Sequence, residues 1–323
     1  MRPRALVVPA LICIAALPAP VSATFSLVAC DPEGSCGAAV ATNNLAVGST
    51  VIHARAEVGA LATQFETNPG YGPKGLSLLA GGAAPADVIE RLLAEDGDFD
   101  GTTVAHRQVG LVGSNGKSAA YTGDAAMQAT WAGSRNGDGY SIQGNGLASG
   151  QVVSAMERAF LSSPGTLAER LVAGLEAGQS AGGQTTGKLS AALLVRTPAG
   201  DWNDIDLRVD AAAEPVRDLH RLMDMHYARQ AIIRAERQAD RGRTAEAKAS
   251  MKEALQRSRR WDRIWRRAAR LAMRMGDTDE ALKCLGVFRG INPAWAELEL
   301  QDPLYRAMRE DARFRAWLSK KTR

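Results

Sequence analysis

Short apolar runs separated by turn residues fill the first part of the chain and predict a sheet. Residues 24–30 and 36–42 are apolar and flank the turn-rich pentapeptide 31–35, which predicts a β-hairpin. Residues 45–54 and 57–65 predict two further short strands, each interrupted by glycine. Four strands so close together in the sequence favour a fold built on neighbouring strand pairs.

Helical periodicity appears next, and the succession of strands and helices then repeats. Val88, Ile89 and Leu92 recur at helical spacing after Pro85, a favourable first residue of a helix. The predicted elements after residue 65 are helices at 73–82, 85–96, 149–162 and 166–177 and strands at 107–113, 117–123, 140–147, 188–197 and 202–209. Two sheet-forming blocks, each followed by helices, predict a layered α+β sandwich.

The last third of the chain has a different pattern, with many helix-forming residues and few glycines. Residues 213–323 hold 26 Lys/Arg and 16 Asp/Glu, a net charge of +10, whereas residues 24–212 hold 11 and 19, a net charge of −8. The hexapeptides GRTAEA and GDTDEA, which begin at Gly242 and Gly276, lie 34 residues apart, the period of a tetratricopeptide repeat. We therefore predict an all-α, tetratricopeptide-like domain over 213–323, with an ordinary helical bundle as the alternative.

The first 23 residues have the pattern of a secretory signal peptide. Two arginines precede the apolar run 5–17, and the small residues Val21-Ser22-Ala23 form a cleavage site. A membrane anchor is the alternative, but it needs about twenty apolar residues. Cleavage after Ala23 would make the protein secreted or periplasmic and would leave Thr24 as its first residue. The predicted division is thus 1–23, 24–212 and 213–323.

Composition and motifs exclude several functional classes. The 323 residues are 46% apolar and 23% charged, as expected of a packed globular protein rather than a disordered or polytopic membrane protein. The four histidines are scattered, and neither a P-loop nor a dinucleotide fingerprint is present, so we predict no metal and no organic cofactor. The arginine-rich stretch 257–270 either contacts an anionic polymer or is a solvated helix face. We predict no nucleic-acid partner, because the protein would be exported.

Cys30 and Cys36 flank the turn of the first predicted hairpin. In an oxidising compartment they could form a disulfide across the two strands. Two small buried thiols are the alternative.

A threonine at the mature N-terminus has special chemistry. The hydroxyl group of Thr24 is a weak nucleophile, but the α-amine of the same residue, with an ordinary pKa of about 7.7–8.0, can act as its general base directly or through one water. One residue would then supply both catalytic roles. The alternative is that Thr24 is an arbitrary first residue.

Seven successive segments carry a resemblance to a known family. They are TFSLVACDPEGSCGAAVAT (24–42), LAVGSTVIHARAEVGALATQ (45–64), YGPKGLSLLAGG (71–82), YTGDAAMQATWAG (121–133), YSIQGNGLASGQVVSAM (140–156), LAERLVAGLEAGQSAGG (167–183) and LSAALLV (189–195). In this order they resemble the domain-of-unknown-function 1028 family over nearly all of residues 24–222. That family is grouped with the N-terminal nucleophile hydrolases. The resemblance therefore implies a four-layer αββα sandwich, amide-cleaving chemistry and Thr24 as the nucleophile.

The resemblance also implies roles for five other residues. Gln143, Gly144 and Asn145 match the family's Gln-Gly-Asn segment, in which Asn145 is placed to donate a hydrogen bond to a developing oxyanion. Thr63 and Gln64 match its Ala-Thr-Gln segment. These matches imply a catalytic Asn145 and a substrate pocket lined by the other four residues. Asn145 as a turn or helix-capping residue, and Gln64 as a satisfied buried amide, are the alternatives.

Two segments depart from the family pattern. Where the family commonly reads Gly-Gly-Asp-Arg-Arg-Gly, this chain has Gln184, Thr185 and Thr186 between its glycines, and Ala211–Ala213 stand where acidic and histidine residues usually follow. If those charges bind substrate in relatives, this protein takes a less charged substrate or has lost activity.

Two functions from different classes follow from these observations. The first is an exported amidohydrolase that attacks a linear C–N bond of a small or peptide-like amide through Thr24. The alternative is a non-catalytic envelope scaffold, in which the sandwich binds a ligand and the basic helical repeats bind a partner protein or an anionic wall polymer. A third interpretation of the opposite net charges of 24–212 and 213–323 is that the basic helical domain docks on the acidic sandwich.

Overall fold

The computed structural model describes residues 23–258, 260–310, 312, 314 and 315. The predicted signal peptide therefore lies outside the described residues, except for Ala23. The contacts divide the chain into one unit of residues up to 206 with 210–213, and a second unit of 207–209 with the residues from 214 onward. Among the described residues, no helix is both long enough and apolar enough to span a bilayer.

Two sheets, of six and four strands within the described residues, form the first unit, apart from residues 207–209 of the last strand, which are grouped with the second. Their strand orders are β10-β9-β2-β1-β8-β7 and β3-β4-β5-β6. The strands are β1 (Thr24–Cys30), β2 (Cys36–Thr42), β3 (Ile52–Arg55), β4 (Gly59–Phe65), β5 (Arg107–Gly113), β6 (Ser118–Thr122), β7 (Gly133–Gly137), β8 (Tyr140–Asn145), β9 (Ser190–Arg196) and β10 (Ile205–Val209). Strand β1 lies inside its sheet, paired antiparallel with β2 on one side and β8 on the other.

Most predicted strands are confirmed, and two differences have clear causes. The antiparallel pairing of β1 with β2 confirms the first hairpin. The strand predicted at 45–54 is wrong in its first half, because residues 47–49 form a 3-10 turn after Ala46, whose φ is +52°. The sequence GSRNG of β7 carries no apolar alternation, so its pairing with β8 could not be foreseen from pattern alone.

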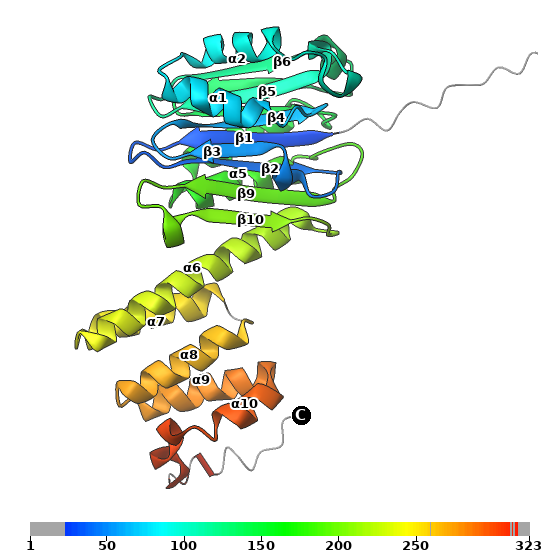
Figure 1. The fold of residues 1–323 in the computed structure, drawn as a ribbon. Coiled ribbons are helices and arrows are strands. Elements are labelled where there is room, and N and C mark those ends of the chain that lie inside the picture. The colour runs from blue at the N-terminus through cyan, green and yellow to red at the C-terminus, as the bar shows by residue number, and fades with distance from the viewer. Residues whose placement is uncertain (1–22, 259, 311, 313, 316–323) are drawn as a thin grey trace, which may run out of the picture. The chain divides into compact units, whose positions relative to one another are not determined.

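Helices cover both sheets on their outer faces (Figure 1). They are α1 (Tyr71–Ala80), α2 (Pro85–Ala94), α4 (Gln151–Ser162) and α5 (Leu167–Ser180), whereas the short helix α3 (Asp124–Met127) contacts the 3-10 turn at Val104–His106. Helices α1 and α2 contact the four-stranded sheet, α4 and α5 contact the six-stranded sheet, and β1 and β8 contact β4 and β5 across the space between the sheets. The layers thus follow as helices, sheet, sheet and helices, and this mixed α+β unit confirms the predicted class.

The two faces of β1 enter different cores. Phe25 and Leu27 point toward α5, where a Cβ atom at Gly178 would lie 3.4 Å from the Phe25 ring. Val28 points the other way and joins Ala60 and other small apolar residues between the sheets. Toward the start of β1 this inter-sheet space becomes polar, which is where the candidate site lies.

The second unit consists of antiparallel helix pairs. Its helices are α6 (Pro215–Asp240), α7 (Thr244–Arg257), α8 (Asp262–Arg274), α9 (Thr278–Ile291) and α10 (Pro293–Glu299). Helices α7 and α9 begin 34 residues apart, just after Gly242 and Gly276, whose φ angles are +72° and +74°. Glycine adopts this left-handed conformation without strain. Alanines such as Ala231 and Ala268 fill the buried helix contacts and allow close packing.

Candidate functional site

Thr24 lies at an edge of the sandwich where several strands begin or end. It is the first residue of β1, and it pairs directly with Thr42, the last residue of β2, and with Asn145, the last residue of β8. In the facing sheet, Gln64 near the end of β4 pairs with Gln108 near the start of β5. One edge therefore collects polar side chains from both sheets.

All three polar groups of Thr24 are hydrogen-bonded to side chains of neighbouring strands. The N–H group donates to Asn145 Oδ1 at 3.2 Å, the carbonyl oxygen accepts from Gln64 Nε2 at 3.3 Å, and the hydroxyl lies 3.0 Å from Thr42 Oγ1. Thr24 is only 3% exposed, and Ala23 before it is 1% exposed. The nitrogen of Thr24 is here an amide, because Ala23 still precedes it.

The hydroxyl of Thr42 determines the direction in which the Thr24 hydroxyl points. Thr42 Oγ1 donates its single proton to the carbonyl oxygen of Ala23 at 2.7 Å, and a carbonyl oxygen can only accept. The bond between the two threonine hydroxyls must therefore be donated by Thr24. Thr42 also accepts from the N–H of Asn44 at 3.3 Å, so its donor and both of its lone pairs are used.

Gln108 forms four hydrogen bonds of 3.0 Å or less, two of which cross to the six-stranded sheet. Its Oε1 accepts from Gln64 Nε2 and from Asn145 Nδ2, both at 2.8 Å. Its Nε2 donates to Thr122 Oγ1 at 3.0 Å and to the carbonyl of Gly144 at 2.9 Å. Every polar position of this fully buried amide is thus satisfied, as a buried polar network requires.

Gln143 extends the network along the inter-sheet face. Its Nε2 donates to Ser26 Oγ at 2.6 Å, and its Oε1 accepts from Ser141 Oγ at 3.0 Å. Ser26 Oγ in turn donates to Gln64 Oε1 at 2.6 Å. A Cβ atom at Gly110 of β5 would lie 1.8 Å from Gln143 Oε1, so glycine is needed there to leave room for the amide.

Of the predicted substrate-binding residues, Thr63 lies on the other face of its strand. Side chains alternate along β4, so Gln64 faces the six-stranded sheet while Thr63 points, like Leu61, toward the cluster packed under α1 and α2. Thr63 Oγ1 is buried and has no hydrogen-bond partner among the described residues. Gly144 contributes only its carbonyl oxygen, which accepts from Gln108. The structure brings the remaining predicted residues together and leaves Thr63 outside the network.

The side chain of Asn145 is oriented by its neighbours on both sides. Its oxygen faces the nitrogen of Thr24, and one of its two Nδ2 hydrogens is taken by Gln108. The predicted oxyanion role therefore concerns only the second Nδ2 hydrogen. The amide oxygen would accept a hydrogen bond equally well from an amine at the position of the Thr24 nitrogen.

Sequence reasoning did not single out Thr42 or Gln108. Each is a polar residue next to an apolar run, in CGAAVAT (36–42) and QVGLVG (108–113). A polar side chain in a buried strand must find a partner, because burying it without a hydrogen bond costs free energy. That requirement is the signal by which both residues could have been found.

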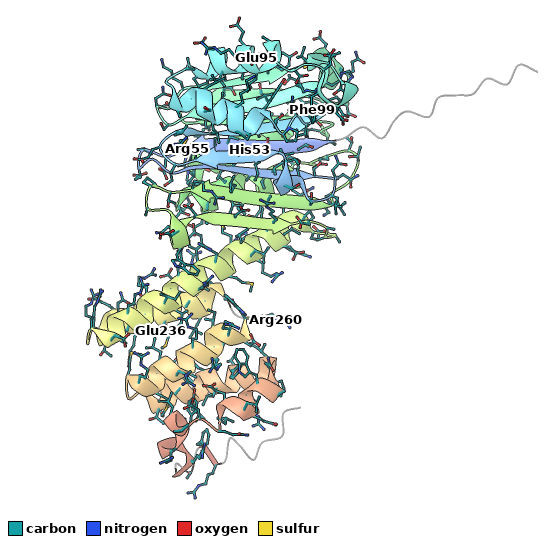
Figure 2. The ribbon with its side chains drawn as sticks, viewed as in Figure 1. His53, Arg55, Glu95, Phe99, Glu236 and Arg260 are labelled. Atoms are coloured by element: carbon teal, nitrogen blue, oxygen red, sulfur yellow. A yellow bond between two sulfur atoms is a disulfide. The ribbon has the colours of Figure 1, made fainter. Side chains whose placement is uncertain are left out.

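Arg107 is buried beside the site and binds the loop that precedes β5. Its Nε and Nη2 donate to the two carboxylate oxygens of Asp96 at 3.0 Å, and Nη2 also donates to the carbonyl of Phe99, which Figure 2 labels. Burial alone would raise the pKa of Asp96, but hydrogen bonds from Arg107, Tyr71 and Asn68 outweigh it and lower that pKa to about 2. The ion pair thereby fixes the backbone next to Gln108.

His53 lies away from this network, on β3 (Figure 2). Its Nε2 is 3.2 Å from the carbonyl of Thr50, and a Cβ atom at Gly72 would lie 2.2 Å from its ring. Burial between these elements lowers the pKa of the imidazole, so it is neutral at physiological pH. Among the described residues, no group of three or more His, Cys, Asp or Glu side chains is placed to hold a metal ion.

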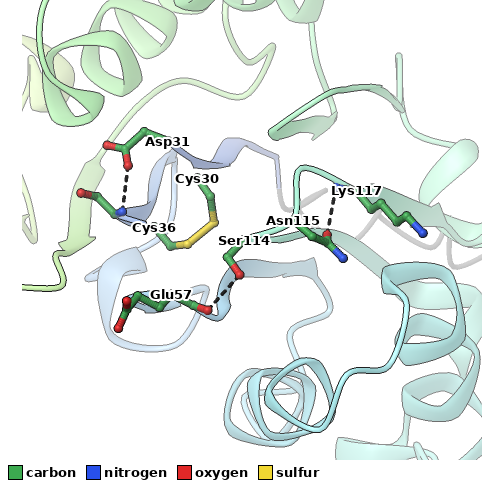
Figure 3. The surroundings of a disulfide bond; sticks show 8 residues. Cys30, Asp31, Cys36, Glu57, Ser114, Asn115 and Lys117 are labelled. Carbon is green, nitrogen blue, oxygen red and sulfur yellow. Dashed lines mark hydrogen bonds between the residues drawn. A yellow bond between two sulfur atoms is a disulfide. The ribbon is translucent and has the colours of Figure 1, made fainter. Parts of the chain in front are cut away.

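Cys30 and Cys36 form a disulfide at the far end of the β1–β2 hairpin (Figure 3), which confirms the predicted pair. The turn between them is held by the N–H of Ser35, which donates to Asp31 Oδ1 at 2.8 Å. The disulfide and Thr24 thus lie at opposite ends of the same strand. The bond supports the hairpin without entering the site.

The two segments that depart from the family pattern lie in loops at the Thr24 edge. Gln184 Nε2 donates to the carbonyl of Ala41 at 2.9 Å, next to the last residue of β2. The N–H of Ala212 donates to the carbonyl of Leu189 at 2.8 Å, just before β9, whose first residue pairs with Thr42. The missing charges would therefore have stood beside the candidate site.

Arginine side chains gather on one face of α8 in the helical unit. A groove of about 490 Å³ is lined by Glu236, Arg263, Arg266, Arg267, Arg270, Leu271 and Arg274. Acidic residues neutralise part of this face: Arg267 pairs with Glu236, and Arg270 pairs with Asp302 at 2.8 Å. Trp265 of the same helix is partly buried against the helical core, as expected if the stretch 257–270 is a solvated helix face.

The protein is of the class that joins a layered α+β unit to a helical repeat unit. Its α+β unit has two sheets packed between helices and a buried polar site at the first residue of a central strand. The model of the "Family of unknown function (DUF1028)" matches residues 24–219, so the chain belongs to that family. A tetratricopeptide repeat model matches residues 238–299. Both matches confirm the resemblances found in the sequence.

Comparison with solved structures finds a member of the same family, protein SPO2555 from Silicibacter pomeroyi. The two chains are 34% identical with a TM-score of 0.56, and the match covers 62% of this chain and 85% of the other. No curated protein matches the chain. The similar structure supports the fold of the first unit, and it names no activity.

Proposed function

We propose that the mature protein is an exported amidohydrolase that cleaves a linear C–N amide bond, with Thr24 as its N-terminal nucleophile. The sandwich is then of the N-terminal nucleophile hydrolase type, a four-layer αββα arrangement. The proposal rests on the setting of Thr24, whose nitrogen, hydroxyl and carbonyl groups are each held by a side chain from a neighbouring strand. After removal of Ala23, the same residue would present an amine and a hydroxyl in one fixed position.

In the proposed reaction, Thr24 Oγ1 adds to the carbonyl carbon of the amide while the α-amine accepts the hydroxyl proton. Asn145 Oδ1 orients the amine through the hydrogen bond that now holds the amide nitrogen. The second Nδ2 hydrogen of Asn145, together with backbone N–H groups, would stabilise the oxyanion. The protonated amine then returns the proton to the leaving nitrogen, and water hydrolyses the remaining ester on Thr24. The scheme uses neither a metal nor an organic cofactor.

Processing belongs to the same proposal. Signal cleavage after Ala23 would deliver the protein to the periplasm or the exterior and free the amine. Because Ala23 and Thr24 are both buried, the bond between them must be cut before β1 pairs with its neighbours. The Cys30–Cys36 disulfide is compatible with an oxidising compartment outside the cytoplasm.

Two measurements test the proposal in sequence. The first is the intact mass and N-terminal sequence of the protein recovered from the envelope fraction of its host; we expect a chain that begins at Thr24. The second is hydrolysis of a panel of linear amides by the wild type and by Thr24→Ala, with thermal melting to confirm that both fold. The proposal would be refuted by a chain that begins elsewhere, or by equal hydrolysis of the amides by the wild type and Thr24→Ala.

A second candidate function is a non-catalytic envelope scaffold, and the arginine-lined face of α8 favours it. Arg263 and Arg266 stack within 6 Å of the Trp295 ring, so this face offers cationic and aromatic groups together. A protein partner with acidic residues, or an anionic wall polymer, would fit such a surface. Retention on envelope fractions that falls with salt and is lost in Arg263→Glu/Arg270→Glu would support it, provided that Thr24→Ala has no effect on retention.

A further inference from the structure

The hydroxyl of Thr42 stands between the Thr24 hydroxyl and the group that precedes Thr24. Its oxygen is 3.0 Å from Thr24 Oγ1, and its proton points to the carbonyl oxygen of Ala23 at 2.7 Å. The carbonyl carbon of Ala23 is bonded to the nitrogen of Thr24. Thr42 therefore reaches toward both the nucleophile and the base of the proposed reaction.

Removal of Ala23 would take away the carbonyl oxygen that accepts the proton of Thr42. The nitrogen of Thr24 would keep its hydrogen bond to Asn145 Oδ1 and gain a lone pair in the direction formerly taken by the carbonyl carbon. The Thr42 hydroxyl, which donates to the oxygen bonded to that carbon, would lose this acceptor and would be free to turn its proton toward the amine. Thr42 would also keep the N–H of Asn44, 3.3 Å away, which fixes its oxygen in place.

Direct transfer of the proton within Thr24 has poor geometry. The hydroxyl and the amine of one threonine are separated by only two carbon atoms, so an O–H···N hydrogen bond between them is strongly bent. Hydrogen bonds weaken steeply when the angle at hydrogen falls below about 120°. A relay through a third group avoids this bend, and the hydroxyl of Thr42 is already hydrogen-bonded to the Thr24 hydroxyl and to the carbonyl oxygen next to the Thr24 nitrogen.

We propose, on the basis of the proposed function, that Thr42 relays the proton between the hydroxyl and the α-amine of Thr24. As Thr24 Oγ1 bonds to the substrate carbonyl carbon, its proton moves to Thr42 Oγ1, and the proton of Thr42 moves to the amine. The carbonyl π electrons become the oxyanion, the amine becomes an ammonium, and Thr42 ends unchanged. On collapse of the intermediate, the C–N bond breaks as the Thr42 hydroxyl donates its proton to the leaving nitrogen and takes one from the Thr24 ammonium. The amine and the hydroxyl of Thr42 are both restored, and the acyl group remains as an ester on Thr24.

The test uses the mature chain 24–323, released from a cleavable fusion so that Thr24 is its first residue, with p-nitrophenyl acetate as the acyl donor. The measured rate is p-nitrophenolate release in excess of the Thr24→Ala variant. Thr42→Ala and Thr42→Ser form the central pair, because they differ by one hydroxyl group. Thr63→Val is the matched control, since it removes a buried threonine hydroxyl on the face of β4 that points away from the site.

We expect Thr42→Ala to lower the Thr24-dependent rate by about 100-fold, the scale of general base catalysis, and Thr42→Ser to stay within about 5-fold of the wild type. Thr63→Val should leave the rate unchanged. In mixtures of H₂O and D₂O, the wild-type rate should fall along a curve, because two protons move, and the residual Thr42→Ala rate along a straight line. Thermal melting of each variant verifies folding.

The possible failures are distinguishable. If the wild type is no faster than Thr24→Ala, the nucleophile itself is refuted and the relay with it. If the wild type is faster but Thr42→Ala matches it, Thr24 acts without Thr42. If Thr42→Ser is as slow as Thr42→Ala, or the wild-type dependence on deuterium is a straight line, Thr42 only supports the fold and the relay is overturned.

Discussion

Replacing Gln108 by methionine tests whether the polar layer between the sheets works as one hydrogen-bonded network. Methionine has similar length, but it would leave the side-chain donors of Gln64 and Asn145, and the acceptors of Thr122 and Gly144, without this partner. A buried polar group left unsatisfied costs about 1–3 kcal/mol. Because the apolar end of methionine recovers part of this loss, we expect the free energy of unfolding to fall by about 4 kcal/mol.

Thr63→Val is the matched control for this substitution. Thr63 is as fully buried as Gln108 and lies on the adjacent strand β4, but its hydroxyl has no partner among the described residues. Valine has nearly the same shape, so we expect no loss or a small gain in stability. Urea denaturation followed by hydrogen exchange of peptides 59–65 and 107–113 reports on the first unit separately from the helical unit. A loss below about 1 kcal/mol for Gln108→Met, or equal losses for both variants, would refute the reasoning.

Three further predictions concern the surroundings of the site. Asp96→Asn should lower stability at pH 7 by about 3 kcal/mol, because it leaves the buried charge of Arg107 without its counter-charge. The pKa of Asp96 is lowered to about 2, so its contribution of about 2 kcal/mol is present above pH 4 and lost as the pH falls toward 2; unfolding free energies measured over this range should show that loss in the wild type and not in the variant. Gly110→Ala should cost about 2 kcal/mol in denaturant unfolding and slow the Thr24-dependent reaction, because its methyl group displaces the Gln143 amide; an unchanged crystal position of Gln143 would contradict this. Serine at both positions of the disulfide should cost about 2 kcal/mol but leave the Thr24-dependent rate intact, since the bond is at the other end of β1.

The sequence predicts correctly those helices and strands whose formation depends on residues close together in the chain. The first hairpin follows from two apolar runs around a turn, and the pairs α6–α7 and α8–α9 follow from a 34-residue period whose glycines adopt positive φ. Strand β7 was missed because its polar sequence is a strand only through pairing with β8. The first half of the segment 45–54 is not a strand because Val47 enters the inter-sheet core from a 3-10 turn, while Leu45 is exposed.

The residues of the candidate site also differ in whether their role depends on the local sequence or on contacts between distant strands. Thr24 could be predicted because its chemistry depends on its position in the chain, and Asn145 because a family motif contains it. Gln108 could not, since its role depends on contacts with strands between 36 and 44 residues away and on which faces meet between the sheets. Thr63 and Gln64 show the limit of a motif: adjacent residues of one strand point to opposite faces, so only one of them can face the site.

The two segments that depart from the family pattern lie at the edge of the sandwich that holds Thr24. Gln184 and its neighbours contact the end of β2, and Ala212 contacts the residue before β9, so neutral residues stand at the edge that holds Thr24. At positions 184–186 a charged substrate group would find no opposite charge, whereas relatives with Asp-Arg-Arg at these positions would supply one. We therefore expect the ratio of kcat/KM for a neutral acyl anilide over its carboxylate analogue to exceed one in the wild type, and to fall when Gln184, Thr185 and Thr186 are replaced by Asp, Arg and Arg. An unchanged ratio would show that these loops, although adjacent to Thr24, do not select the substrate.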